Sequence, residues 1–331
     1  MMGKTMANKS LSQSGLTYEE SFVLMGTAVS IRVVGRETIY TMSQSIRRAL
    51  SAMQAVEMAC SRFDSQSALR HLMRHPGELI EVPPALFYAL QIAQQMSELT
   101  QGMFDPTVGN SMERFGFNRH YVTQEVVSSE VLLETPVSYH DIMLVEETSA
   151  VMLKKPMVID LGGVAKGLAV DMARKELEGW DGFAINAGGD VYVQGVDPHG
   201  EPWDIGVEHP KEAMGYIATL RGTNIAVATS GSYRQRSPIQ SDVHHLWNPV
   251  TMQSPQDIVS LTVIAPWAVL ADAAATAAFL LGSSHALSFI DDLGLAGLMV
   301  KDNLSVVETT SMKQYGLSTT PACRQEPVTT Q

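Results

Sequence analysis

The chain has 331 residues, of which 45% are apolar and 18% charged, and its formal net charge is −12. A chain this long and this apolar can bury a sizeable core, which excludes intrinsic disorder as its main state. The acidic balance argues against general binding to nucleic acid or to an anionic membrane.

The two ends of the chain are polar. Residues 1–18 are rich in Ser, Lys and Gln and predict a mobile tail, and residues 311–331 predict a loose tail, which leaves one domain over 19–310. The N-terminus carries no secretory apolar stretch and no lipid-anchor cysteine, and no run elsewhere is apolar enough to span a bilayer. The sequence as given therefore predicts a cytoplasmic protein; an export signal outside it would place the protein in the periplasm.

Hydrophobic periodicity predicts helices and strands in mixed order. Helices are expected around 46–60, from Pro83 and Pro84 to a cap near Gly102, over 164–177, and around 270–281 and 284–293. Strands are expected at 22–34, 151–160, 183–186, 190–195, 203–208, 216–220, 224–229, 258–265, 296–300 and 304–308. This order is not a βαβ alternation, so the predicted class is α+β.

The two cysteines lie far apart and have no metal-ligand spacing. Cys60 falls in a helical apolar pattern and Cys323 in the C-terminal tail. A disulfide framework and a structural zinc site are therefore unlikely outcomes of this sequence, and Cys60 is expected to be buried.

Two segments suggest a site for a phosphorylated ligand. Asp160-Leu161-Gly162-Gly163 leads from a strand into a helix that carries Lys166, and such a turn either binds an anion or is an ordinary tight turn with a surface lysine. Asp272 and Thr276 are four residues apart on an alanine-rich helix, so they share one face. Their hard oxygens suit Mg²⁺; the alternative is a buried Asp satisfied by backbone donors.

Three further segments carry polar residues in turns. Met103-Phe104-Asp105 follows a helix and leads into an Asp-Pro turn, which is usually ordinary structure; the functional alternative is an exposed aromatic beside a carboxylate, able to hold a planar ring. The segment 227–233 leads to a His pair at 244–245, where His245 is a candidate for proton transfer, although one inward and one outward histidine is the structural alternative. The segment 184–190 is interpreted as a structural hairpin; Ser230 lacks the sequence context of a hydrolase nucleophile.

Together, these segments resemble the FAD:protein FMN transferases of the ApbE family. The resemblance runs from Phe22 to Val300 and rests on MGTAVSIRV, SRFDSQSALRHL, GMFDPTVG, IDLGGVAKGLAVD, INAGGDVYVQG, WDIGVEHP, VATSGSY, HHLWNP and ADAAATAAFLLG. It implies an α+β fold in which two related halves enclose FAD. It also implies Mg²⁺-dependent transfer of FMN from FAD to a Thr or Ser hydroxyl of an acceptor protein, with release of AMP.

The resemblance also implies roles for particular residues. Asp272 and Thr276, with backbone oxygens at Gly163 and Ala275, would hold the metal ion. Lys166 and His245 would be catalytic, Lys166 at the phosphates and His245 taking the proton from the acceptor hydroxyl. The expected FAD-binding residues are Met25, Phe63, Met103, Phe104, Asp105, Asp160, Lys166 and His245. The implied acceptors include subunits of NADH:quinone reductase-type electron-transfer complexes.

Four positions depart from the family pattern. Asn248 and Ser232 stand where Asp is usual, Met252 where Gly is usual, and Phe63 where Tyr is common. Two alternatives to the transferase follow: a flavin-binding protein with little transfer activity, and an FAD pyrophosphatase in which water replaces the acceptor hydroxyl and the products are FMN and AMP.

Overall fold

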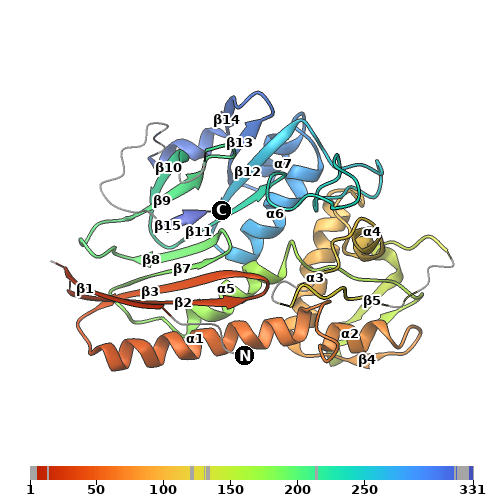
Figure 1. The fold of residues 1–331 in the computed structure, drawn as a ribbon, viewed down its shortest axis with the longest axis horizontal. Coiled ribbons are helices and arrows are strands. Elements are labelled where there is room, and N and C mark those ends of the chain that lie inside the picture. Colours follow the sequence, from red (N-terminus) through yellow and green to blue (C-terminus); the bar gives the residue numbers. More distant parts are fainter. Residues whose placement is uncertain are drawn as a thin grey trace.

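A computed structural model describes residues 6–12, 15–119, 123–129, 131, 135–212, 215–316, 318 and 328–330. Helices and antiparallel sheets form one layered α+β structure, as the element order predicted (Figure 1).

The centre of the fold is an antiparallel sheet of nine strands. From edge to edge the strands are β1 (Met6–Ser12), β2 (Gly15–Leu24), β3 (Thr27–Gly35), β7 (Gly182–Ala187), β8 (Asp190–Gly195), β11 (Ile225–Gly231), β12 (Ile258–Ala265), β13 (Ala296–Lys301) and β14 (Val306–Glu308). Most of the inner strands are buried along their whole length, because both faces of the sheet are covered.

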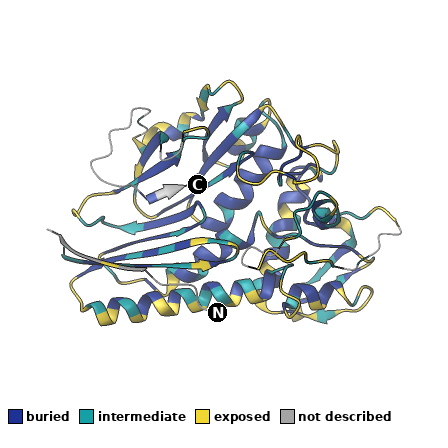
Figure 2. Ribbon diagram, viewed as in Figure 1, coloured by how far each residue is buried: buried dark blue, intermediate teal, exposed yellow. Residues whose placement is uncertain are grey.

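Helices cover one face of this sheet. They are α1 (Ile39–Cys60), α5 (Ala165–Lys175), α6 (Ala268–Leu280) and α7 (Ala286–Asp292), and α3 (Pro84–Leu99) packs against α1 and α6 in the same layer. In Figure 1, α1 runs along the outside of the layer, and it packs against α5, which in turn packs against α6. Figure 2 shows that α1 buries only its inner face, as its apolar spacing predicts.

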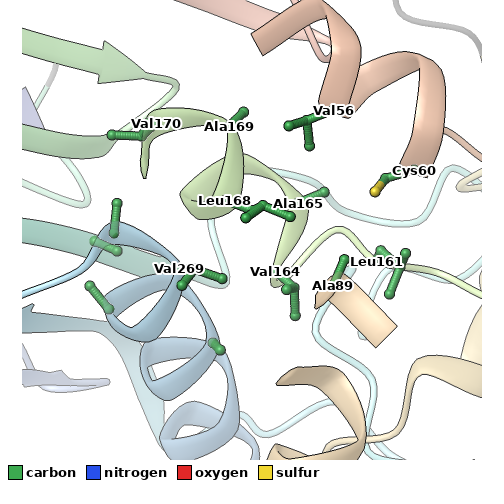
Figure 3. Close-up of a cluster of buried hydrophobic side chains, with 14 of the residues drawn as sticks. Val56, Cys60, Ala89, Leu161, Val164, Ala165, Leu168, Ala169, Val170 and Val269 are labelled. Carbon is green, nitrogen blue, oxygen red and sulfur yellow. The ribbon is translucent and has the colours of Figure 1, made fainter. Parts of the chain in front are cut away.

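The core between these helices contains small and branched side chains. In Figure 3, Val56 and Cys60 of α1 lie beside Ala165 and Ala169 of α5. Cys60 is 5% exposed, which confirms its predicted burial. Burial raises the pKa of its thiol to about 12, so it is an unreactive core residue.

A smaller sheet covers the other face. It is ordered β10 (Tyr216–Gly222), β9 (Trp203–Glu208) and β15 (Val328–Thr330), and the pairing of β15 with β9 is parallel. Trp203 and Ile205 of β9 pack against Val191 and Val193 of β8 in a second apolar cluster.

A third sheet and several short helices lie beyond α3. The strands are β4 (Ile80–Glu81), β6 (Ala150–Leu153) and β5 (Ile142–Val145); the short helices are α2 (Ala68–Met73), α4 (Gly109–Arg114), and the 3₁₀ turns η1 (Pro106–Val108), η2 (Tyr139–Asp141) and η3 (Glu146–Thr148). A further turn, η4 (Thr310–Tyr315), follows β14. No helix in the described ranges has the length and apolar content that a bilayer crossing requires.

Three predicted elements were wrong. The strand expected at 22–34 is a hairpin, because Met25 and Gly26 adopt φ of +53° and +74° and turn the chain between β2 and β3. The strand expected at 151–160 ends at Leu153. Residues 6–12 of the predicted mobile tail form β1, since pairing with β2 uses main-chain hydrogen bonds and requires no apolar composition.

The predicted loose C-terminal tail also contains regular structure. Part of η4 falls within 311–331, and β15 at 328–330 adds a strand to the smaller sheet through main-chain pairing with β9. The domain boundaries at 19 and 310 stay a prediction.

Candidate active site

The predicted anion-binding turn leads into α5. The main-chain N–H of Asp160 donates to the carbonyl of Pro106 at 2.8 Å, and its carboxylate accepts the N–H of Gly162 at 2.7 Å. This second bond closes an Asx turn that directs the chain into the helix. Lys166 therefore lies in the first turn of α5, where the neighbouring N–H groups of Ala165 and Gly167 donate to the carbonyl of Leu161 and to Asp272.

Lys166 connects two carboxylates from different elements. Its Nζ lies 2.7 Å from Oδ2 of Asp190, at the start of β8, and 3.3 Å from each carboxylate oxygen of Asp272 in α6. The side chains of both acids are 4% exposed, whereas that of Lys166 is 27% exposed. The sequence did not assign Asp190 to the site, because a Gly-Gly-Asp sequence between two strands is typical of an ordinary hairpin.

This cluster is strongly coupled electrostatically. Burial by itself would lower the pKa of Lys166, but the charges of Asp190 and Asp272 outweigh it and raise that pKa. Burial and the neighbouring Asp272 raise the pKa of Asp190 to about 8, against the opposing effect of Lys166. The cause is the number of groups: two buried carboxylates share one ammonium.

The packing of α5 against α6 fixes this geometry. The N–H of Gly167 donates to Oδ2 of Asp272 at 3.1 Å. One turn later, the carboxylate of Asp171 accepts the N–H groups of Ala268 and Val269, at 3.0 and 2.8 Å, and so caps the start of α6. Both contacts hold Asp272 next to the first turn of α5.

Thr276 faces the same turn. A β-carbon at Gly163 would lie 3.0 Å from Oγ1 of Thr276, so the two residues are in direct contact. Ser230 at the end of β11 lies 3.0 Å from that hydroxyl, a partner that the sequence did not suggest. The structure thus brings Gly163, Lys166, Asp272 and Thr276 together, and Ala275 precedes Thr276 within α6. The roles that the resemblance implies for them stay predictions.

A buried arginine joins Asp160 to the segment after α1. Nε of Arg62 lies 2.5 Å from Oδ2 of Asp160, and its guanidinium stacks on the ring of Phe63 at 4.2 Å. Burial would raise the pKa of Asp160, but Arg62 and the N–H of Gly162 lower it. Arg62 was not predicted as a site residue, because nothing in the sequence pairs it with a carboxylate 98 residues away.

The histidine pair lies in the long segment between β11 and β12. His244 is fully buried and contacts the carbonyl of Pro255 at 2.8 Å, whereas His245 is half-buried with Nδ1 3.3 Å from the carbonyl of Gln235. Burial, then His244, lowers the pKa of His245 to about 4, and Lys166 and Asp160 also act on its charge. Lys166 lowers the pKa of His245 and Asp160 raises it, and the ring is neutral near pH 7.

Two of the departures from the family pattern have hydrogen-bond partners. The amide of Asn248 donates to the carbonyl of Leu280, at the end of α6, at 3.0 Å, and its oxygen accepts the N–H groups of Val250 and Thr251. The hydroxyl of Ser232 donates to the carbonyl of Val259 at 3.3 Å. Met252 is exposed with φ +54°, a conformation that favours glycine.

The loop after α3 differs from its prediction. Phe104 is 6% exposed and Asp105 is 7% exposed, so the expectation of an exposed aromatic beside an open carboxylate is wrong. The oxygens of Asp105 accept the N–H and hydroxyl of Thr107 and the N–H of Tyr139, and the residue caps η1. Burial raises its pKa. Met103 stays half-buried.

Met25 lies in the β2–β3 turn, where its N–H donates to Glu57 of α1 at 2.7 Å. Its contact with a flavin, and that of Phe63, Met103, Phe104 and Asp105, stays a prediction.

The donor set at α6 fits a hard divalent cation. It combines the carboxylate of Asp272, the hydroxyl of Thr276 and nearby carbonyls, all oxygen ligands. The second buried acid, Asp190, has a pKa of about 8 because one ammonium lies between two acids, and a further cation nearby would favour its ionised form. The described part of the chain holds no group of three or more His, Cys, Asp and Glu side chains suited to a metal, so hydroxyl and carbonyl oxygens would have to complete the site.

Comparisons with known proteins find similar proteins over most of the chain. Residues 25–299 match the model of the ApbE family. A FAD:protein FMN transferase of Rhodobacter capsulatus is 31% identical over 72% of the chain, although the match spans 46% of that protein's length. A second FAD:protein FMN transferase, from Haemophilus influenzae, is 27% identical over 92% of the chain and 90% of that protein.

Solved structures have the same fold. The ApbE protein of Thermotoga maritima is 29% identical, covers 94% of this chain and 99% of its own, and has a TM-score of 0.77. The flavin transferase ApbE of Vibrio cholerae is 22% identical, covers 94% and 100% of the two chains, and has a TM-score of 0.74; it supports the fold alone.

Proposed function

Because this chain belongs to the ApbE family, we propose that it is a transferase that moves FMN from FAD to an acceptor protein. Curated relatives are named for this reaction. The observation that best supports the proposal is the convergence of Lys166, Asp190 and Asp272 at the first turn of α5, because phosphoryl transfer depends mainly on positioned charge.

The pyrophosphate of FAD would bind at this turn. Lys166 places a positive charge in the first turn of α5, and the helix dipole adds a partial positive charge at the same end. Asp160, held by Arg62 and Gly162, fixes the shape of the turn and would contact a polar group of FAD. These residues explain how an acidic protein would bind one small polyanion.

Asp272, Thr276 and the backbone oxygens of Gly163 and Ala275 would hold Mg²⁺. When bound, the ion supplies charge neutralisation at the pyrophosphate. Ser230 supports the Thr276 hydroxyl, and Gly163 leaves room for it because any side chain there would collide with it.

His245 would take the proton from the acceptor hydroxyl. Its pKa of about 4 keeps the ring neutral at pH 7, which is the form that accepts a proton. A hydrogen bond from Nδ1–H to the carbonyl of Gln235 assigns the proton to Nδ1 and leaves Nε2 as the acceptor. Bound pyrophosphate would offset the charge of Lys166 and bring the pKa of His245 back toward neutrality.

The acceptor would present a Thr or Ser hydroxyl, and AMP would leave as the hydroxyl oxygen bonds to the FMN phosphorus. An NADH:quinone reductase-type subunit is the class of acceptor to be tried first. Met25, Phe63 and the 103–105 loop would line the flavin or adenine site.

A product analysis tests this proposal. The purified chain is incubated with FAD and Mg²⁺, with and without such an acceptor, and the acceptor mass and free nucleotides are measured. The transferase gives a covalent FMN adduct and AMP only with the acceptor. AMP and free FMN without acceptor would instead indicate a pyrophosphatase, and bound FAD without either product a flavin-binding protein.

The substitutions that motivated the binding-protein alternative have structural partners. Asn248 and Ser232 both form hydrogen bonds that order the segment around His245. We therefore favour the transferase.

A further inference from the structure

We infer that the ammonium of Lys166 neutralises the carboxylate of Asp272 when no metal ion is bound. When a divalent metal ion binds this carboxylate, the ammonium moves away from it. Asp190 is the anchor that keeps Lys166 at the site during the exchange. This inference rests on the proposed function, because that function assigns Asp272 to a metal ion.

The contacts of Asp272 carry the first step. Both of its oxygens lie 3.3 Å from Nζ of Lys166, so the ammonium covers the carboxylate as a bidentate partner. The N–H of Gly167 also donates to Oδ2 of Asp272, at 3.1 Å, and the side chain of Asp190 lies within hydrogen-bonding reach of the same carboxylate. Lys166 is also the more exposed member, with 27% of its side chain exposed against 4% for Asp272.

Distances limit how both cations can share Asp272. A Mg²⁺ ion lies about 2.1 Å from a ligating oxygen. An ion on either oxygen of Asp272 would therefore be no more than about 5.4 Å from the ammonium in its present position, given the 3.3 Å contact. Like charges at this separation in a largely buried site repel each other, so we expect the ammonium to move away from Asp272.

Asp190 determines where Lys166 remains. It holds Nζ at 2.7 Å, the shortest of the ammonium's contacts, and it belongs to β8 instead of α6. Loss of the Asp272 contact therefore leaves the ammonium attached to the sheet, with its freed donors available for a phosphate oxygen. Asp190 is thus a positioning residue for Lys166 and not a metal ligand in this scheme.

A double variant tests the competition for Asp272. Lys166→Met together with Asp190→Asn removes the ammonium and one of the two acids that share it, which leaves Asp272 as the one acid of this cluster. It also avoids leaving two buried carboxylates without a cation, which is the risk of Lys166→Met alone. The matched control is Lys155→Met with Asp141→Asn, a pair with a contact of 3.0 Å in a different part of the fold.

Binding of Mn²⁺, used as the probe ion, is measured by calorimetry and by paramagnetic resonance on the full chain without flavin. We expect the K166M/D190N protein to bind Mn²⁺ at least about tenfold more tightly than the wild type, and K155M/D141N to match the wild type. Lys166→Arg, which keeps the charge, is expected to stay close to the wild-type affinity.

Equal or weaker Mn²⁺ binding by the double variant, or no binding by any form, would overturn the exchange. So would a gain of the same size in the control pair. These measurements use no FAD and no acceptor, so failure of FMN transfer and failure of the exchange are observed separately.

Discussion

Replacement of Gly167 by Ala should have two opposing effects on the free energy of unfolding. Helix propensity raises it, and tertiary packing lowers it. Within a helix, Ala is favoured over Gly by about 1 kcal/mol, so an isolated α5 would become more stable. In the folded chain, however, the new β-carbon would lie 2.4 Å from the carbonyl oxygen of Ala268 and 2.7 Å from Cα of Val269. Both atoms are backbone and cannot rotate away.

The collision requires α5 and α6 to separate by about 1 Å, the difference between the 2.4 Å contact and an ordinary one. Overpacking of this kind costs about 1–3 kcal/mol. The shift also stretches the 3.1 Å bond from the Gly167 N–H to Asp272, which leaves a buried carboxylate with one donor fewer and adds about 1–2 kcal/mol. After the propensity gain, the net loss is about 1–4 kcal/mol in the free energy of unfolding.

The free energy of unfolding is measured by urea denaturation, and FMN transfer and Mn²⁺ binding are measured on the same preparations. Gly215→Ala is the control, because its new β-carbon would meet the exposed Glu212 at 3.2 Å or more, a contact that a shift of a few tenths of an ångström relieves. It should change stability by less than about 0.5 kcal/mol. A Gly167→Ala protein as stable as the wild type, with intact transfer, would refute the argument that this helix contact positions Asp272.

Three other predictions concern residues around the same site. Asp171→Ala should lower the free energy of unfolding, measured in urea, by about 1–3 kcal/mol, because two N–H groups at the start of α6 lose their acceptor. Asp171→Asn should lower it by a smaller amount, and an equal loss in the two variants would contradict the capping role. Asn248→Asp should lower the melting temperature more at pH 8 than at pH 5, because an ionised carboxylate opposes the carbonyl of Leu280 while a protonated one can donate to it; a pH-independent effect would contradict this. For His245, the folded pKa of about 4 lies below its ordinary 6.5, so the unfolded state binds the proton first and stability falls as the pH drops from 6.5 to 4. Its ring resonances should therefore show no titration above pH 5, and His245→Gln should flatten this part of the stability profile; a titration near 6.5 would show that the ring is not desolvated.

The sequence predicted regular elements best where periodicity was long. The helix through Ile46 and Cys60 and the strand at 258–265 both correspond to observed elements, because their apolar faces are buried at matching intervals. It failed where backbone conformation decided the outcome. The apolar run from 22 to 34 conceals a turn whose first residue, Met25, has positive φ without being a glycine. Strand β1 is set by main-chain pairing, which composition does not encode.

In the candidate site, too, local spacing was visible in the sequence and contacts between distant residues were not. The i, i+4 spacing of Asp272 and Thr276 was visible in the sequence, and both side chains do face the turn before α5. Asp190 and Arg62 were not assigned, because their roles depend on partners 24 and 98 residues away that only the fold brings near. Phe104 was expected to be exposed, whereas packing around η1 buries it.

The most direct test of FMN transfer measures the acceptor protein by mass spectrometry after incubation with FAD and Mg²⁺. We expect an FMN adduct with the wild-type chain and none with Asp272→Ala. Asp204→Asn, on the opposite side of the large sheet, should give the wild-type yield. Full adduct formation by the folded Asp272→Ala protein would contradict the account.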